Sequence, residues 1–447
     1  MTPADHHPSD QPAPTPSERI AGSVPAPPPL PPAVIDAPAP PLRPVAAAER
    51  IETLDVVRGF ALLGILVPNM IDFGLPNASE LSPQAVLPEA GAWNTFGVWV
   101  VYAFFRGKTM ALFAMLFGAG VILYGRKFDR RDPLPPLHAG AGLWHRRMGW
   151  LLAIGLLHLV LLWDGDILHT YAIAGVGWLW WVRRWRARWL LALGLGVVAL
   201  TEGLPVVLSL AFMSGEHPQP VSAYEYVPAH AGGIGRIILD RLPEAAGSLA
   251  MSLFYFAWVS AGLMTVGMGL TRLGILTGSR STRTFAVLAA AGLLAGVALP
   301  AAALALCLEP IMTDWRWAWP VTLATWAVAP IGAIGYVAAL VLLLRVPRLG
   351  RAIGWLLAPV GRTALSNYVL HSAAGVFVFY GAGLGLEGRL HHGQLFALTL
   401  AFWAGSIVAS RLWLRFFRFG PLEWAWRCLT YWRPEPLRRL GSTPSPA

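Results

Sequence analysis

Long apolar runs constrain this chain more than any other feature. About ten stretches of roughly 20 mostly apolar residues recur along it, each long enough to cross a bilayer as a helix. Of the 447 residues, 55% are hydrophobic and only 13% charged, whereas soluble domains carry about 25% charged residues. The sequence therefore predicts an all-α polytopic membrane protein embedded in a lipid bilayer. The predicted spans are residues 54–73, 107–125, 147–163, 167–182, 189–212, 248–271, 284–306, 320–344, 361–380 and 394–413.

The distribution of arginines gives these spans an orientation. The basic clusters all fall on one side of the membrane if the short aromatic stretch 92–105 lies on the outer surface. Counting that stretch as a further span would break the segregation. Because positive charge collects on the cytoplasmic side, we expect both termini in the cytoplasm. The net charge of +10 then follows from topology and does not indicate nucleic-acid binding.

The chain divides into three predicted regions. Residues 1–49 are rich in Pro, Ala and Ser and lack apolar periodicity, so we expect a disordered cytoplasmic tail. Residues 50–432 hold all the predicted spans, and residues 433–447 should form a short cytoplasmic tail. The two cysteines show no metal-ligand spacing, and no motif indicates a metal or a covalently bound cofactor.

Ionisable residues cluster at the expected outer boundary of the membrane. The segment between two spans contains Asp164, Asp166 and His169, and His158 lies about 8 Å below the outer end of its own span. Ionisable groups at such positions are costly and often functional. We interpret His158 as a general base that Asp164 or Asp166 would orient, with Asp164 preferred. The alternatives are a neutral buried histidine and, for Asp166, a helix N-cap.

The first span carries a polar residue toward each end. Arg58 lies at the cytoplasmic entrance, three residues after Asp55, where a fixed cation could hold a phosphate group. The alternative is a positively charged anchor. Asn69 lies about 16 Å further along the helix. Pro68 beside it removes a backbone donor and can bend the helix, which would free a carbonyl. The alternative is that Asn69 is only a helix-end cap.

The ninth span opens with Arg362 and continues through Asn367 and Tyr368. Together with Arg58, these residues could frame a cytoplasmic site for an anionic cofactor or headgroup. Polar residues in membrane helices also hydrogen-bond between helices, so a structural role is the alternative.

Five segments resemble, in order, the signatures of one known family, the YeiB-like family, also called domain of unknown function 418. The resemblance covers about residues 50–432, with the C-terminal signature part at about 248–432. The segments are Leu54–Asn69, Leu112–Gly120, Gly155–Tyr171, Gly361–Leu386 and Phe416–Thr430.

This resemblance implies a function. The family is grouped with membrane-embedded acyltransferases, including the lysosomal heparan-α-glucosaminide N-acetyltransferase and bacterial enzymes that decorate glycans. An acyl group would pass from cytoplasmic acyl-CoA to a glycan or small-molecule acceptor on the outer face of the inner membrane of a bacterium. Arg58 and Arg362 would face the CoA phosphates, and Asn69 with the His158–Asp164 region would face the acceptor. In this transfer, Asn69 would donate a hydrogen bond to the developing oxyanion. The sugar acetyltransferase has a catalytic histidine shortly after the position of Asn69; this chain has none there, so His158 would serve.

Two other functions remain open from the sequence. A transporter or exporter of a small polar or anionic molecule could use the same carboxylates and histidine to carry protons, although no internal repeat of the kind common in transporters is visible. A non-catalytic membrane scaffold is the other possibility.

Overall fold

The computed structural model describes residues 51–75, 91–129, 135–204, 230, 232–313 and 315–439, with the backbone alone for those between 307 and 324. The predicted tail at 1–49 lies outside these residues, as do residues 440–447. Within this part of the chain the only extended pairing is one isolated bridge, Phe417–Arg438, and the rest is helices, turns and loops.

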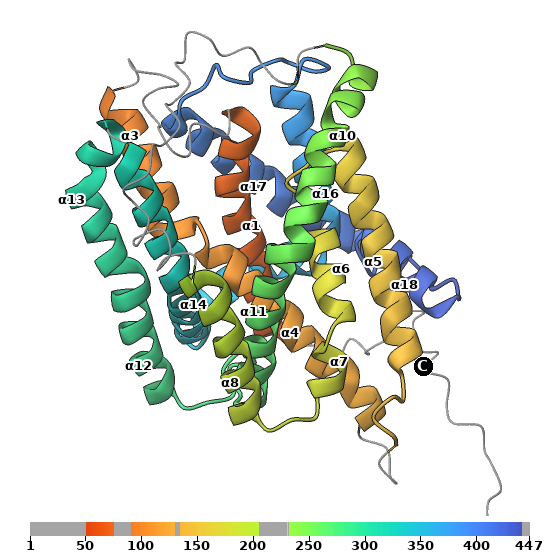
Figure 1. Ribbon diagram of the computed structural model, residues 1–447. Helices are drawn as coiled ribbons and strands as arrows, with labels where there is room; N and C mark the ends of the chain where they lie inside the picture. Colours follow the sequence, from red (N-terminus) through yellow and green to blue (C-terminus); the bar gives the residue numbers. More distant parts are fainter. Residues whose placement is uncertain are drawn as a thin grey trace, which may run out of the picture. The chain divides into compact units, whose positions relative to one another are not determined.

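The helices pack together as a bundle (Figure 1). Their bounds, with π-helical segments marked η, are α1 Glu52–Gly74, α3 Gly91–Val100, η4 Val101–Phe105, α4 Lys108–Asp129, α5 Ala141–Leu161, α6 Leu168–Val176, α7 Leu179–Val182, α8 Ala187–Val198, η5 Ala199–Gly203, α10 Ile234–Met251, η7 Ser252–Phe256, α11 Ala257–Arg272, α12 Thr282–Leu293, η8 Leu294–Ala298, α13 Leu299–Thr313, α14 Trp315–Leu344, α15 Pro347–Arg362, α16 Ala364–Phe379, α17 His392–Phe416 and α18 Pro421–Tyr431.

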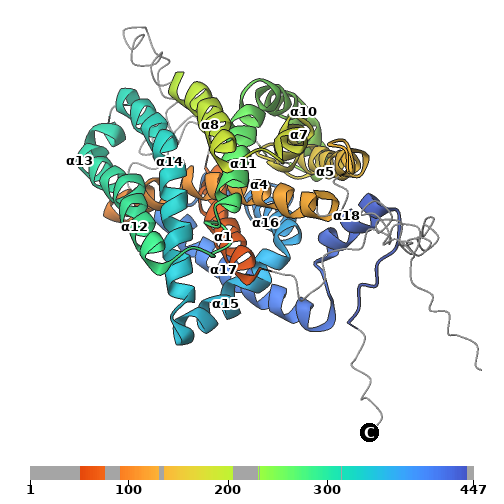
Figure 2. The ribbon, with the colours of Figure 1, turned by 90° about the horizontal axis from the view of Figure 1, so that it is seen from below.

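The first helix is the centre of the bundle. α1 contacts α4, α15, α16 and α17, and Figures 1 and 2 show it in the middle with other helices around it. Nearly all of its apolar side chains are buried. Within a bilayer, moving a helix from lipid into the bundle removes no apolar surface from water, so the hydrophobic effect does not drive its packing. Close packing and interhelical hydrogen bonds hold such a helix in place instead.

The surface of the bundle identifies its surroundings. Large apolar side chains point outward, including Phe254 at 83% exposed and Leu306 at 85%. Soluble monomers rarely present extended apolar surface, whereas a helix bundle in lipid requires it. Six stretches of the described helices are long and apolar enough to cross a membrane, and they are Glu52–Gly74, Gly91–Asp129, Ile234–Arg272, Thr282–Leu306, Thr325–Leu344 and His392–Phe416. The all-α membrane fold is thus confirmed; the count of ten spans and the cytoplasmic termini stay predictions.

The aromatic stretch 92–105 and the predicted span 107–125 form one broken helix. α3 and η4 lead through Arg106 and Gly107 into α4, and the chain changes direction there (Figure 1). Lys108 is fully buried at the break and donates to the carbonyl of Tyr102 at 3.2 Å. α3 packs against α13 and α17, so the stretch is built into the bundle. Its position relative to a bilayer stays a prediction.

Helices α1 and α15 meet backbone to backbone. A methyl group placed on Gly361 would lie 1.9 Å from the carbonyl oxygen of Asp55, and one on Gly59 would lie 2.1 Å from that of Leu357. No side chain fits in either position, so glycine is required for this approach. The crossing brings the backbone next to Arg362 onto the turn of α1 that carries Arg58.

A carboxylate from α18 caps the start of α16. One Glu423 oxygen accepts from the backbone nitrogens of Leu365 at 2.7 Å and Ser366 at 3.2 Å, and the other accepts from the Ser366 hydroxyl at 2.5 Å. A negative charge at a helix N-terminus satisfies free N–H groups and complements the helix dipole. Glu423 therefore fastens the C-terminal helix to the helix that carries Tyr368.

We predict that Glu423→Ala lowers the free energy of unfolding by about 1–3 kcal/mol, because buried N–H donors lose their acceptor. Glu423→Gln, which keeps one carbonyl oxygen, should cost less. Thermal unfolding of the detergent-solubilised protein measures both. Equal stability of the Ala variant and the wild type would contradict the capping role.

Candidate functional site

A buried carboxylate lies between two histidines. Oδ1 of Asp166 is 3.0 Å from Nδ1 of His158, and Oδ2 is 2.7 Å from Nδ1 of His169. Oδ2 also accepts from the backbone nitrogen of His169 at 2.8 Å, so Asp166 satisfies a free N–H group in the first turn of α6, although the N-cap position itself is Ile167. All three residues are buried. One carboxylate thus orients two imidazole rings.

The local sequence explains how the three residues meet. α5 ends at Leu161, three residues after His158, and α6 begins at Leu168. The short connection between them carries Asp166 back toward α5. A methyl group on Gly155 would lie 2.3 Å from the backbone nitrogen of His169, so this glycine allows the start of α6 to approach α5.

Tyr368 closes this site from α16. Its ring stacks on that of His158 with 5.1 Å between ring centres and 30° between planes. Its hydroxyl oxygen accepts from the backbone nitrogen of Ile167 at 3.1 Å and interacts with the Asp166 carboxylate. The sequence placed Tyr368 beside Arg58 and Arg362; the structure instead places it against His158.

The far side of His169 is held by hydroxyl groups. Its Nε2 lies 2.8 Å from the hydroxyl of Ser252, which is 2.7 Å from the hydroxyl of Thr170. Ser252 begins η7, the π-helical turn between α10 and α11. The sequence analysis missed both hydroxyls, since a serine at the start of a long apolar run has no distinguishing pattern. This network fixes His169 and, through it, Asp166.

His158 differs from His169 in having an imidazole nitrogen that nothing holds. Within the part of the chain that the structure describes, Nε2 of His158 has no hydrogen-bond partner, although the residue is only 3% exposed. Its contact with Asp166 is an ion-pair distance without good hydrogen-bond alignment. Leaving a buried polar atom unpaired costs about 1–3 kcal/mol. The free nitrogen is therefore the position where a proton could be exchanged.

Asp164 does not orient His158, contrary to the expectation from sequence. Its carbonyl oxygen accepts from the Ser248 hydroxyl at 2.8 Å, and its charge acts on Asp72 and Glu244. Of the two carboxylates, Asp166 is the one that lies within ion-pair distance of the imidazole.

Asn69 lies on the central helix, one turn before Asp72. It is half-buried, and residues three apart share a helix face, so it lies on the side of α1 that carries Asp72. No hydrogen bond among the described residues joins Asn69 to His158. Its predicted role as an oxyanion donor stays a prediction.

On the side predicted to be cytoplasmic, Arg58 is partly exposed. Nη1 donates to Oδ1 of Asp55 at 3.0 Å and lies 3.4 Å from the carbonyl oxygen of Gly361, the residue before Arg362. The α1–α15 crossing thus brings the two arginine positions together. Asn367 makes different contacts: its amide nitrogen donates to the hydroxyls of Thr363 at 2.9 Å and Ser410 at 2.8 Å, which joins α16 to α17.

Further basic residues lie near Arg58. The charges of Arg427 and Arg58 both act on Arg147, which is half-buried. The Arg147 guanidinium lies 3.6 Å from the centre of the Trp426 ring, and the Trp426 indole donates to the Arg147 carbonyl at 2.8 Å. Cation–π stacking of this kind holds an arginine in place without neutralising its charge.

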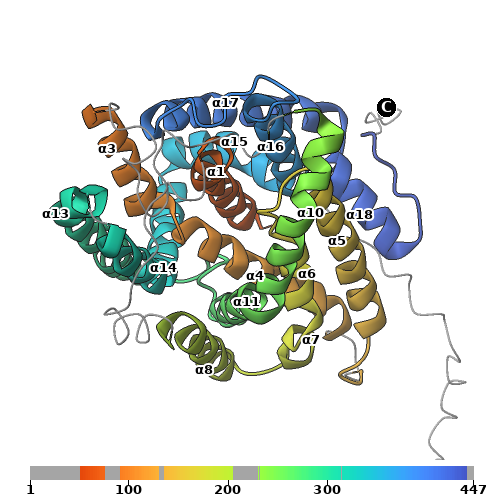
Figure 3. The ribbon, with the colours of Figure 1, turned by 45° about the horizontal axis from the view of Figure 1, so that its top comes forward.

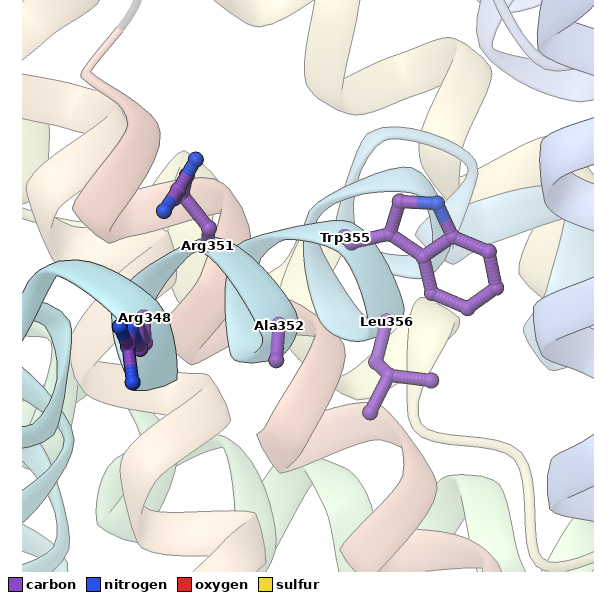
Figure 4. A pocket seen from close by; sticks show the side chains of 5 residues that line it. All are labelled: Arg348, Arg351, Ala352, Trp355 and Leu356. Carbon is purple, nitrogen blue, oxygen red and sulfur yellow. The ribbon is translucent and has the colours of Figure 1, made fainter.

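The exposed face of helix α15 carries a separate basic and aromatic surface. A shallow hollow there is lined by Arg348, Arg351, Ala352, Trp355 and Leu356 (Figure 4). Tryptophan and arginine on one amphipathic helix are typical of a helix at the membrane interface. This surface contains none of the predicted site residues.

The pKa of Asp166 gives a test of the paired carboxylate. Burial alone would raise this pKa, but the interactions with the close His158 and the hydrogen-bonded His169 outweigh burial and hold it below the ordinary value of 3.8. A lowered carboxyl pKa stabilises the fold above the ordinary pKa, and that stabilisation is lost as the pH falls through the lowered pKa. We therefore predict that the stability difference between wild type and Asp166→Asn is largest above about pH 4 and shrinks in stronger acid.

Unfolding measured between neutral pH and strong acid checks this difference. Asp164→Asn, two residues away, is the matched control and should show no comparable dependence. A difference that stays constant with pH would contradict the pairing.

Comparisons with known proteins extend over nearly the whole bundle. The family described as "Protein of unknown function (DUF418)" matches residues 270–433. The chain is 34% identical over 402 residues to "Uncharacterized protein YeiB" of Escherichia coli (strain K12), covering 86% of this chain and 96% of that protein. It is 30% identical over 407 residues to "Uncharacterized protein YxaH" of Bacillus subtilis (strain 168), with the same two coverages. The resemblance seen in the five segments is thus confirmed, and the chain belongs to the YeiB-like family of membrane proteins.

Proposed function

We propose that this protein transfers an acyl group from cytoplasmic acyl-CoA to an acceptor at the outer face of a bacterial inner membrane. One observation carries the proposal: His158 is a buried imidazole whose Nδ1 lies 3.0 Å from the Asp166 carboxylate and whose Nε2 has no hydrogen-bond partner among the residues that the structure describes. A carboxylate on Nδ1 fixes the tautomer that leaves Nε2 able to accept a proton.

The chemistry would run through that nitrogen. Nε2 of His158 takes the proton of an acceptor hydroxyl or amine as the acceptor attacks the thioester carbonyl. The carbon–sulfur bond then breaks, and the CoA thiolate leaves and recovers a proton from the imidazolium. Asp166 stabilises the transient positive charge on the ring, and the stacked Tyr368 keeps the ring from rotating. Asn69 is the proposed donor to the oxyanion.

The donor site would use the arginines on the opposite side. Arg58 lies against the backbone beside Arg362, and Arg147 and Arg427 lie within electrostatic reach. Several fixed guanidinium groups suit the phosphates of a nucleotide such as CoA, because each can donate two parallel hydrogen bonds. Asn367 has its amide engaged between helices, and it contributes to the shape of this region through packing.

Transport of a small polar or anionic molecule is the second candidate, and one observation favours it. The helix from α3 to α4 breaks at Arg106 and Gly107, where Lys108 is buried and Arg106 lies 3.6 Å from Asp72. Broken helices with buried charges are common in secondary transporters. The paired, stacked His158 is what favours an enzyme over a carrier, since a proton carrier needs no fixed ring orientation.

Binding of acetyl-CoA to the purified, detergent-solubilised protein tests the proposal first. We predict saturable binding that the double variant Arg58→Ala, Arg362→Ala weakens by at least about tenfold, because two phosphate contacts are lost. The matched control replaces two exposed arginines predicted to face the same side, Arg186→Ala with Arg283→Ala, and should bind like the wild type. Absence of binding for acetyl-CoA and longer acyl-CoA donors would refute CoA-dependent transfer.

Measuring turnover distinguishes the proposed role of His158 as general base from the role of the arginines in binding the donor. His158→Gln should lower the rate of CoA release about 10²- to 10⁴-fold, the usual contribution of a general base, while leaving acetyl-CoA affinity unchanged. Release of free thiol from acetyl-CoA in the presence of membrane extract measures the rate. A His158→Gln variant that turns over normally would remove His158 from the mechanism.

A further inference from the structure

A second polar cluster lies at the end of the bundle where α1 and α16 end and α10 passes. Oδ1 of Asp72 is 3.6 Å from Nη2 of Arg106, and the charge of Asp164 acts on both Asp72 and Glu244. Figure 3 turns this end of the bundle toward the reader. The charged members of the cluster are Asp72, Arg106, Asp164, Arg241, Glu244 and Glu387.

Two fully buried side chains in this cluster have polar atoms without partners. Arg241 and Tyr380 are each 1% exposed. Nη1 of Arg241 donates to the carbonyl of Val160 at 3.2 Å. Its Nε and Nη2, and the hydroxyl of Tyr380, have no hydrogen-bond partner among the described residues. A buried guanidinium that is only partly satisfied is costly, so such groups are retained where something else binds them.

The unsatisfied atoms lie within electrostatic reach of the carboxylates. The charges that act on the Tyr380 hydroxyl come from Asp164, Arg241, Glu387 and Glu244, and the Arg241 guanidinium lies 5.5 Å from the Tyr380 ring centre. His230, whose ring stacks on that of Tyr380, lies 3.2 Å from Glu387 and 4.0 Å from Glu244. Hydrogen-bond donors and acceptors thus belong to one cluster.

His230 fixes the tyrosine in this arrangement. Its ring stacks on that of Tyr380 with 3.8 Å between centres and 4° between planes. Nδ1 of His230 lies 3.2 Å from Oε1 of Glu387, which holds the imidazole over the ring. The Tyr380 ring is therefore held in place by stacking, although its hydroxyl has no hydrogen-bond partner among the described residues.

The mixture of charges selects the chemistry of a ligand. An anion would meet Arg241 favourably but would be repelled by four carboxylates. An ammonium group would meet the carboxylates but would be repelled by Arg106 and Arg241. A hydroxyl group both accepts and donates, so neighbouring hydroxyls can accept from Arg241 and Tyr380 while they donate to Asp164. Only a neutral ligand with several hydroxyls uses every member of the set.

We propose that this cluster binds a neutral polyhydroxylated ligand, such as a sugar ring, through Arg241, Tyr380 and Asp164. The site adjoins the histidine pair, because Arg241 binds the carbonyl of Val160, two residues after His158, and Asp164 is two residues before Asp166. The identification of this ligand as the acyl acceptor rests on the proposed function. Its binding to this cluster is independent of the proposed function.

Equilibrium binding to the full chain, in a detergent without a sugar headgroup and without acyl-CoA, tests the proposal. The probes are glucose and maltose, with glucosamine and glucuronate as charged counterparts. Quenching of tryptophan fluorescence reports binding, since Trp163 is buried against Phe73, next to Asp72. We expect a neutral sugar to saturate the protein and to bind at least about tenfold more tightly than its charged counterparts.

Three variants locate the site. Arg241→Gln and Tyr380→Phe should each weaken sugar binding by about tenfold or more, because each removes a hydrogen bond to the ligand. Arg236→Gln, on the same helix with a side chain 77% exposed, is the matched control and should bind like the wild type. Without ligand, Tyr380→Phe should leave the midpoint of thermal unfolding unchanged or raise it, since the hydroxyl has no partner to lose.

Several results would overturn the proposal. They are no binding of either neutral sugar, tighter binding of the amine or the carboxylate, unchanged binding by Tyr380→Phe, or a lowered unfolding midpoint of that variant, which would show a structural hydrogen bond. The outcome is separable from that of acyl transfer. If the protein binds acetyl-CoA but no sugar, the sugar site is refuted and acyl transfer is not. If it binds sugar but no acetyl-CoA, CoA-dependent acyl transfer is refuted and the sugar site is not.

Discussion

A charged carboxylate in the interior of a membrane protein has to be paired, and the arrangement around Asp166 follows from that requirement. The two imidazoles occupy its two oxygens, and Tyr368 reaches it from a third helix. Each partner comes from a different element, so pairing one charge ties α5, α6 and α16 together. The hydroxyls of Ser252 and Thr170 complete one side of the network. His169 has partners on both ring nitrogens, whereas Nε2 of His158 has none among the described residues. A purely structural network would satisfy both histidines, so the difference indicates a functional site.

The two ends of the bundle are linked through the central helix. α1 carries Arg58 near one end and Asp72 near the other, and its glycine contact with α15 sets where the arginines meet. Because α1 is enclosed by α4, α15, α16 and α17, its two ends hold a fixed spacing. A donor held by arginines at one end and an acceptor held by Arg241 and Tyr380 at the other would both have to reach the histidine from opposite directions. This geometry is what transfer across a membrane requires.

The sequence predicted the class of fold and part of the site for physical reasons. Runs of apolar residues dictate helices in lipid regardless of tertiary detail, so the membrane bundle could be inferred directly. His158 and Asp166 stood out because ionisable residues are rare in apolar surroundings and both lie in one short segment.

The remaining assignments depend on which face of a helix meets which neighbour. The sequence favoured Asp164 over Asp166 as the partner of His158, and it placed Tyr368 with the arginines rather than against His158. Arg241 and Ser252 lie more than eighty residues from the segment they contact, and no local pattern marks them.

The side of the membrane on which each part of acetyl-CoA ends up distinguishes acyl transfer from transport of the intact thioester. Inside-out membrane vesicles expose the predicted cytoplasmic face to acetyl-CoA labelled in its acetyl group and, separately, in its adenine. The account predicts that acetyl label accumulates inside on a new molecule while adenine label stays outside, and that His158→Gln vesicles accumulate neither. Entry of both labels together would show transport of the intact thioester and contradict acyl transfer.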